Sequence, residues 1–169
     1  MRLPFFNQSR QADAEALYAA VVAEMRRPAW YRDGGVPDTL DGRFAVLASL
    51  LALADIRLER GVDEARSFAP RLAEVFIADM DAQMRQAGLG DPGLGKQVRR
   101  MVGAFASRVD RWRRAVEESE PWDEVARSTL YADAEPPESA AKAGIEATRD
   151  WWGRLERASD AAIIEGRIG

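Results

Sequence analysis

The segment from Gly90 to Gln97, GDPGLGKQ, comes within one residue of a phosphate-binding loop. That motif requires a serine or threonine after its lysine to bind magnesium, and Gln97 follows Lys96 here. The motif also follows a β-strand, whereas the residues before Gly88 have helical spacing, and Pro92 lacks a backbone N–H that such a loop would use. The segment is therefore interpreted as a turn between two helices.

Two aspartates, Asp79 and Asp81, are candidates for acid–base chemistry or for metal binding. Residues two positions apart on a helix point about 200° away from each other, so both carboxylates cannot reach one ligand. Asp79 falls on an apolar arc with Leu72 and Phe76, where an unpaired charge is costly. We expect it to be partly buried in an ion pair with an arginine of a neighbouring helix, and Arg43 is the first candidate. Contact with a partner protein is the alternative.

Residues 96–114 are the most strongly basic segment, with seven basic side chains and one acidic side chain. Residues 117–165 carry thirteen acidic and five basic side chains. The basic helix is interpreted as a solvated face, or as a face covered by the acidic segment folded back on it; the alternative is an acidic protein surface or lipid headgroups as a partner. The net charge of −4 argues against a nucleic-acid partner. The basic residues that we expect to point away from the core are Lys96, Arg100 and Arg111.

An aromatic cluster formed by Trp30, Tyr31 and Phe44 lies close to Pro37 in the sequence. Such residues usually anchor a loop on the core. The alternative is an exposed patch that binds a protein, because tryptophan and tyrosine are common anchors in interfaces.

The chain contains no cysteine and no histidine. These absences exclude disulfides, thiolate nucleophiles, zinc fingers, histidine general bases and histidine-ligated haem. The sequence therefore predicts no cofactor and no metal, and a binding protein rather than an enzyme. A small-molecule site would need converging polar groups, and the sequence shows none.

The elements that position these residues are helices, because apolar residues recur at helical spacing and no convincing strand pattern is present. The 169 residues, 47% of them hydrophobic, predict an all-α, single-domain helical bundle of about five to seven mostly antiparallel helices. The expected helices cover 12–27, 38–60, 64–87, 94–118, 121–131 and 139–162, the last with Trp152 toward the core, followed by an extended tail. The predicted layout is an N-terminal extension (1–11), a helical domain (12–131), a linker (132–138) and a C-terminal helix and tail (139–169) packed on the same domain.

We expect one set of side chains to be buried together as the core: Phe44, Leu47, Leu51, Val98, Phe105 and Val109. The longest apolar run, residues 44–54, is too short to span a membrane. The first residues lack the apolar stretch of a signal peptide, which predicts a cytoplasmic protein.

Three stretches together resemble the ubiquinol–cytochrome c chaperone family, the assembly factors of the respiratory cytochrome bc complex (complex III). They are RPAWYRDGGVPDTLDGRF (27–44), VFIADMD with the following GLGD (75–81 and 88–91), and GKQVRRM (95–101). The resemblance covers about residues 17–131, and the string GVPDTLDGRF is the most specific part. Residues 165–168, EGRI, are similar to the ending of the family.

The resemblance implies an all-α, non-enzymatic chaperone that binds newly made cytochrome b and promotes assembly of ubiquinol–cytochrome c reductase. It further implies a bacterial protein at the cytoplasmic face of the inner membrane, with peripheral membrane contact, and a small partner protein like that of the mitochondrial relatives. The alternative is a helical adaptor that binds a soluble partner through its basic helix. We predict a binding patch from the first stretch and the third and fourth helices: Trp30, Tyr31, Pro37, Asp38, Asp41, Arg43, Asp79, Asp81, Lys96, Arg100 and Arg111.

Overall fold

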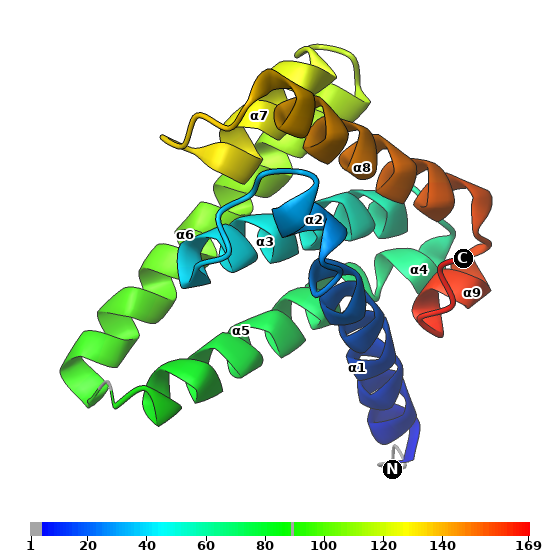
Figure 1. Cartoon of the computed structure of the whole chain (residues 1–169). Coiled ribbons are helices and arrows are strands. Elements are labelled where there is room, and N and C mark those ends of the chain that lie inside the picture. Colours follow the sequence, from blue (N-terminus) through cyan, green and yellow to red (C-terminus); the bar gives the residue numbers. More distant parts are fainter. Residues whose placement is uncertain (1–4, 89) are drawn as a thin grey trace.

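The computed structural model describes the backbone of residues 5–88 and 90–169 and the side chains of residues 14–88, 90 and 92–169. Within these residues the chain forms nine helices and no strand (Figure 1). This confirms the predicted all-α class, and the number exceeds the expected five to seven because three helices have only one turn. The helices are α1 (Phe5–Met25), α2 (Ala29–Arg32), α3 (Leu40–Glu59), α4 (Asp63–Arg66), α5 (Ala69–Gln86), α6 (Asp91–Val116), α7 (Trp122–Tyr131), α8 (Glu138–Arg157) and α9 (Asp160–Ile164).

Helix α3 is the centre of the molecule, and α1, α5, α6, α7 and α8 all contact it. The hydroxyl of Thr39 caps its first turn by accepting a hydrogen bond from the N–H of Gly42 at 3.1 Å. Every residue from Ala45 to Ala54 is buried, as expected for a helix that is apolar on nearly all sides. The charge-free run of the sequence is therefore a core helix.

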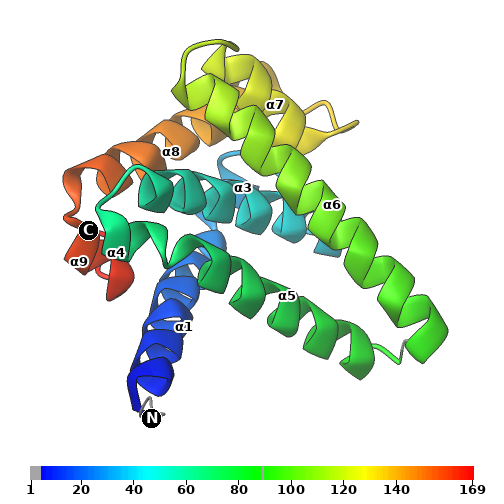
Figure 2. The same ribbon diagram turned by 180° about the vertical axis from the view of Figure 1, so that it is seen from behind.

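The predicted core is correct at four of six positions. Buried together are Leu47, Leu51, Phe105 and Val109, whereas Phe44 and Val98 are only half-buried. Phe44 lies near the start of α3, beneath the guanidinium of Arg108 at 5.3 Å. Val98 lies in the first half of α6, where α5 and α6 form a projecting hairpin (Figures 1 and 2). There it lines a small pocket between the two helices with Phe76, Ile77 and Met80 of α5.

The ends of the chain differ from the prediction. Helix α1 begins at Phe5, seven residues before the expected start, so residues 5–11 continue the first helix. The last predicted helix is divided, because α8 ends at Arg157 and Ala158 has an extended backbone. The hydroxyl of Ser159 then caps α9, whose Ile163 and Ile164 are buried rather than extended at the surface.

The tryptophan pair on α8 also corrects the prediction, which placed Trp152 toward the core. Trp151 is the buried member, 1% exposed, and its indole N–H donates to the carbonyl of Leu50 at 3.1 Å. Trp152 is half-buried, with its ring 6.5 Å from that of Trp122. Trp151 therefore joins α8 to the central helix.

No helix in the described part of the chain is both long and apolar enough to cross a membrane.

Candidate partner-binding surface

The first family-like stretch is anchored from inside by its aromatic residues. Trp30 is 2% exposed, and its indole N–H donates to the carbonyl of Glu24 at 3.0 Å. The hydroxyl of half-buried Tyr31 donates to the carbonyl of Met25 at 2.8 Å. The prediction that Trp30 contacts a partner is therefore wrong, because its side chain is enclosed by the protein's own core.

Glycines hold the same stretch against the C-terminal helices. The hydroxyl of Tyr131 on α7 donates to the carbonyl of Gly34 at 2.6 Å. A Cβ atom on Gly144 of α8 would lie 2.1 Å from that hydroxyl. Gly35 has a φ of +66°, which a side chain would strain. The loop can therefore approach α7 and α8 this closely only because these positions lack side chains.

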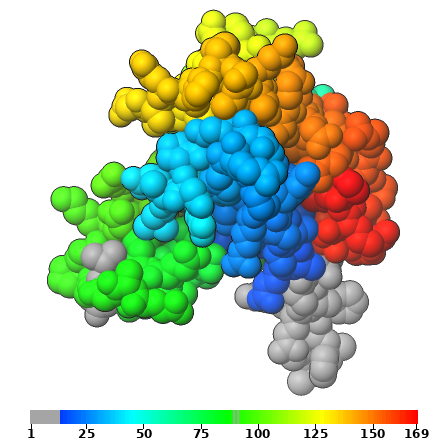
Figure 3. Space-filling model, viewed as in Figure 1, coloured from blue at the N-terminus to red at the C-terminus, as the bar shows by residue number. Residues whose placement is uncertain are grey.

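The outer side of this stretch is exposed, and we call it the motif ridge: Tyr31, Pro37, Asp38, Leu40, Asp41 and Arg43. The guanidinium of Arg43 binds the carboxylate of Asp38 at 2.7 Å and lies 6.0 Å from the centre of the Tyr31 ring. Leu40 is 80% exposed, the most exposed large apolar side chain among the described residues. Figure 3 shows this segment, in pale blue, on the face turned to the viewer and next to the green α5–α6 hairpin.

The ion pair predicted between Asp79 and Arg43 is absent. Asp79 Oδ2 instead accepts hydrogen bonds from the hydroxyl of Tyr18 at 2.6 Å and from the amide of Gln83 at 2.8 Å. Among the side chains that the structure describes, no arginine lies within ion-pair distance of Asp79. Arg43 binds Asp38 on its own loop, whereas Asp79 faces α1. Asp79 is half-buried, as expected.

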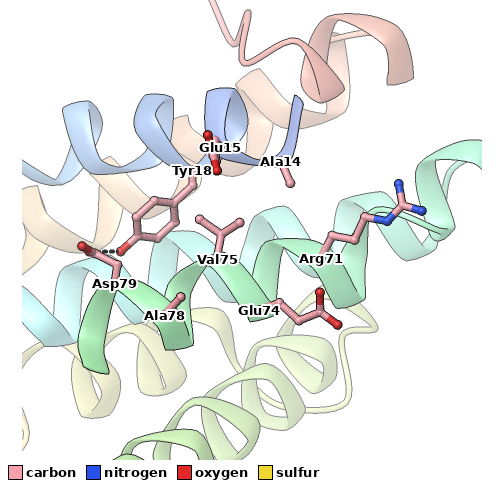
Figure 4. A pocket seen from close by; sticks show the side chains of 8 residues that line it. All are labelled: Ala14, Glu15, Tyr18, Arg71, Glu74, Val75, Ala78 and Asp79. Atoms are coloured by element: carbon pink, nitrogen blue, oxygen red, sulfur yellow. Dashed lines mark hydrogen bonds between the residues drawn. The ribbon is translucent and has the colours of Figure 1, made fainter. Parts of the chain in front are cut away.

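Asp79 lies at one end of a groove between α1 and α5, with a volume of about 530 Å³ (Figure 4). In this view the ring of Tyr18 lies between the two helices beside Val75, and its hydroxyl points at Asp79. Burial is the main cause that raises the pKa of Tyr18 far above its ordinary value, so the phenol stays protonated and donates. The residues that line this α1–α5 groove are Ala14, Glu15, Tyr18, Arg71, Glu74, Val75, Ala78 and Asp79.

The basic residues of α6 divide into two groups. Lys96 and Arg100, near the closed end of the α5–α6 hairpin, are exposed and make no ion pair within the described residues. Asp81, on α5 of the same hairpin, binds Arg85 one turn further on at 2.9 Å. Arg111 is only half-exposed and lies 3.8 Å from a carboxylate oxygen of Glu120. Arg111 therefore contributes less free positive charge than predicted.

The arginines near the C-terminal end of α6 are paired with carboxylates. Arg114 binds Glu120 at 2.7 Å, and Arg113 pairs with Glu59 of α3. Burial raises the pKa of neighbouring Asp55 to about 6, and the charge of Glu59 adds to the effect. Only Glu120 of the acidic segment meets the basic helix in these pairs. Among the described residues of α6, the exposed basic side chains without an ion pair therefore lie at the hairpin, and Arg108 is a half-buried cation over the Phe44 ring.

The structure divides the predicted patch into separate surfaces. Five predicted residues lie together on the motif ridge, and Asp81, Lys96 and Arg100 lie on the hairpin. Arg108 of α6 contacts Phe44 near the start of α3. Lys96 lies twelve residues before Arg108, which places it about 18 Å away along the helix axis. Asp79 belongs to the α1–α5 groove, and Arg111 belongs to the opposite half of α6.

Leu40 was not among the site residues predicted from the sequence, and of the residues that line the α1–α5 groove only Asp79 was. The available signal for Leu40 was its place directly after the cap residue Thr39, where a side chain points away from the body of the helix. Nothing in the sequence indicated that Tyr18 would meet Asp79.

No group of three potential metal-ligating side chains is present among the residues described. The surfaces found here offer apolar contact and charge for binding another molecule.

A family model described as ubiquinol–cytochrome C chaperone matches residues 32–168. The chain belongs to this family. The match includes α7, α8 and α9, so the family domain extends well beyond residue 131, where the resemblance seen in the sequence ended. The crystal structure of the Cbp3 homolog from Brucella abortus is similar, with a TM-score of 0.77 and 26% sequence identity over 98% of this chain and 93% of that chain. No curated protein sequence matches the chain.

Proposed function

We propose that this chain is a non-enzymatic chaperone that binds newly made cytochrome b and promotes assembly of the ubiquinol–cytochrome c reductase complex. The family match over residues 32–168 is the observation that carries the proposal. The client-binding surface in this proposal is the motif ridge. Its inner side chains anchor the loop, while Leu40 is presented to solvent on a helix that is otherwise buried along most of its length. An exposed apolar side chain held on a rigid element is suited to contact an apolar client.

We also propose that the hairpin docks on the cytoplasmic face of the membrane that receives cytochrome b. Lys96 and Arg100 are exposed and make no ion pair within the described residues. Attraction to anionic lipid is worth about 1 kcal/mol for each basic residue near the surface. A few such residues give reversible docking, which suits a chaperone that must leave its client.

Capture of the client tests the proposed function. The tagged full chain is purified from membranes in which newly made proteins have been pulse-labelled. We expect labelled cytochrome b to be retained and to decrease during a chase as it enters the complex. Retention of only soluble proteins, with no labelled cytochrome b, would instead support the adaptor function.

Replacing Leu40 with aspartate is expected to reduce retention of cytochrome b about tenfold while leaving the melting temperature within about 2 °C of wild type. Leu40 is exposed, so the change removes apolar contact with a client without opening the core, and one well-buried leucine is worth about one power of ten in affinity. Val62→Asp is the matched control, because Val62 is also exposed but lies away from the ridge, beside α4. Equal retention by Leu40→Asp and wild type would contradict the role of the ridge.

Reversing two charges on the hairpin, Lys96→Glu with Arg100→Glu, is expected to abolish most binding to vesicles that contain anionic lipid. Added salt should weaken wild-type binding in the same way, because it screens exposed charges. Lys142→Glu with Arg157→Glu on α8 is the matched control, since both residues are exposed and the net charge changes equally. If the two double variants bound vesicles alike, the membrane contact would not lie on the hairpin.

A further inference from the structure

We propose that the α1–α5 groove is a docking site for a cationic amphipathic segment of a partner protein. This proposal goes beyond the binding of cytochrome b and does not depend on it. The groove belongs neither to the motif ridge nor to the basic hairpin end. Its volume is about 530 Å³, and its lining carries more acidic than basic side chains.

The groove has an excess of negative charge that the described residues leave without ion pairs. Glu15 and Glu74 are exposed at its rims, and neither makes an ion pair within the described residues. Asp79 carries the third carboxylate. The single cation of the lining, Arg71, lies with its guanidinium 5.4 Å from the centre of the Phe68 ring and pairs with none of the three. The lining therefore has a net formal charge of −2, which favours a cationic occupant.

Asp79 is held in position to receive that occupant. Both of its hydrogen bonds, from Tyr18 and from Gln83, end on Oδ2. Within the described residues Oδ1 accepts no hydrogen bond, so one oxygen of a fixed carboxylate is free to accept from a lysine or an arginine. A hydrogen bond between an ionised donor and an ionised acceptor is stronger than a neutral one, and an oriented acceptor loses little entropy when it binds.

Between the carboxylates the groove is apolar and lined by small side chains. Figure 4 shows Val75 and Ala78 on the α5 side and Ala14 with the ring of Tyr18 on the α1 side. Arg71 and Asp79, eight residues apart on α5, lie at opposite ends of the lining, about 12 Å from each other along the helix axis. That length corresponds to about two turns of a helix. A groove between two helices, with apolar side chains between charged rims, fits an amphipathic segment laid along α5.

The docking site is tested with the full chain and a fluorescent helical peptide built of leucine and lysine, whose binding is followed by anisotropy. The groove variant carries Glu15→Gln, Glu74→Gln and Asp79→Asn. The matched control carries Glu124→Gln, Glu135→Gln and Glu156→Gln, three exposed carboxylates without ion pairs in the described residues, so that both variants lose the same charge. A third variant, Ala78→Trp, fills the groove at an exposed helical position and keeps every charge.

We expect the dissociation constant to rise about tenfold for the groove variant and for Ala78→Trp, and less than about twofold for the control. Bound peptide should slow hydrogen exchange in α5 between Arg71 and Asp79. Equal weakening in both charge variants would show attraction to the overall charge and overturn the proposal, as would unchanged binding by Ala78→Trp. A leucine–glutamate peptide that bound equally well would also overturn it. Since no cytochrome b is present, failure here leaves the proposed function untouched.

Discussion

Replacing Gly144 with alanine is expected to lower the free energy of unfolding by about 3 kcal/mol, which corresponds to a fall in melting temperature of about 10 °C. The new Cβ atom would lie 2.1 Å from the hydroxyl of Tyr131 and 3.1 Å from the carbonyl of Gly34. Because these distances are too short, either α8 must move away from the loop or Tyr131 must give up its hydrogen bond to Gly34. The first family-like stretch would then lose its attachment to the C-terminal helices.

Gly103→Ala on α6 is the control for this experiment, because among the described residues a Cβ atom there would meet no heavy atom within 4 Å beyond its chain neighbours and the backbone of its own helix. Alanine favours a helix over glycine by about 1 kcal/mol, so this variant should be slightly more stable than wild type. Thermal unfolding followed by circular dichroism measures both variants. A melting temperature for Gly144→Ala equal to that of wild type would show that the close approach of the loop and α8 is not required.

Trp151→Ala is expected to cost about 3–5 kcal/mol of stability, the usual range for removing a buried aromatic side chain. The indole lies against α3, donates to the carbonyl of Leu50 at 3.1 Å, and supports the guanidinium of Arg154 at 5.0 Å from its ring. That guanidinium also lies 2.9 Å from the carboxylate of buried Glu24 on α1, so the change disturbs contacts to two other helices.

The neighbouring Trp152→Ala provides the comparison, because Trp152 is half-buried and lies on the side of Trp122. Urea denaturation of both variants should give a clearly smaller loss for Trp152→Ala. A loss for Trp152→Ala equal to or larger than that for Trp151→Ala would reverse the assignment of the structural tryptophan.

The sequence predicted correctly those buried faces that depend only on the spacing of apolar residues within one helix. The apolar run of residues 44–54 predicted a central helix, and the spacing of Phe105 and Val109 predicted the inner face of α6, because helical periodicity alone specifies such faces. The motif at residues 27–44 contains the most specific part of the family resemblance. These features depend on local spacing or on a continuous string of residues.

The errors arose where two distant segments meet. Periodicity placed Asp79 on a partly buried face, but its partner Tyr18 lies 61 positions away, and nothing local distinguishes Tyr18 from Arg43 as the neighbour. Trp151 and Trp152 are adjacent, so a small rotation of α8 decides which of them is buried, and contact with α3 sets that rotation. Trp30 anchors its loop on the core, as the first of the two interpretations had it, and its inclusion in the binding patch was wrong, because aromatic residues also serve as interface contacts.

The separation of the binding surfaces was also beyond the sequence. Motif residues and basic residues were expected to form one patch, but α6 is 26 residues long and extends past the start of α3. The charges at its first turns therefore lie on the projecting hairpin rather than on the motif ridge. Under the proposed function, the proposed membrane contact and the proposed client contact lie on different parts of the molecule.

Deletion of the gene tests the central claim most directly. The amount of assembled ubiquinol–cytochrome c reductase is measured in membranes on native gels, together with the level of cytochrome b transcript. The account predicts that the assembled complex is lost while the transcript is unchanged, and that a plasmid copy of the wild-type chain restores the complex. Normal amounts of the assembled complex in the deletion strain would contradict the account.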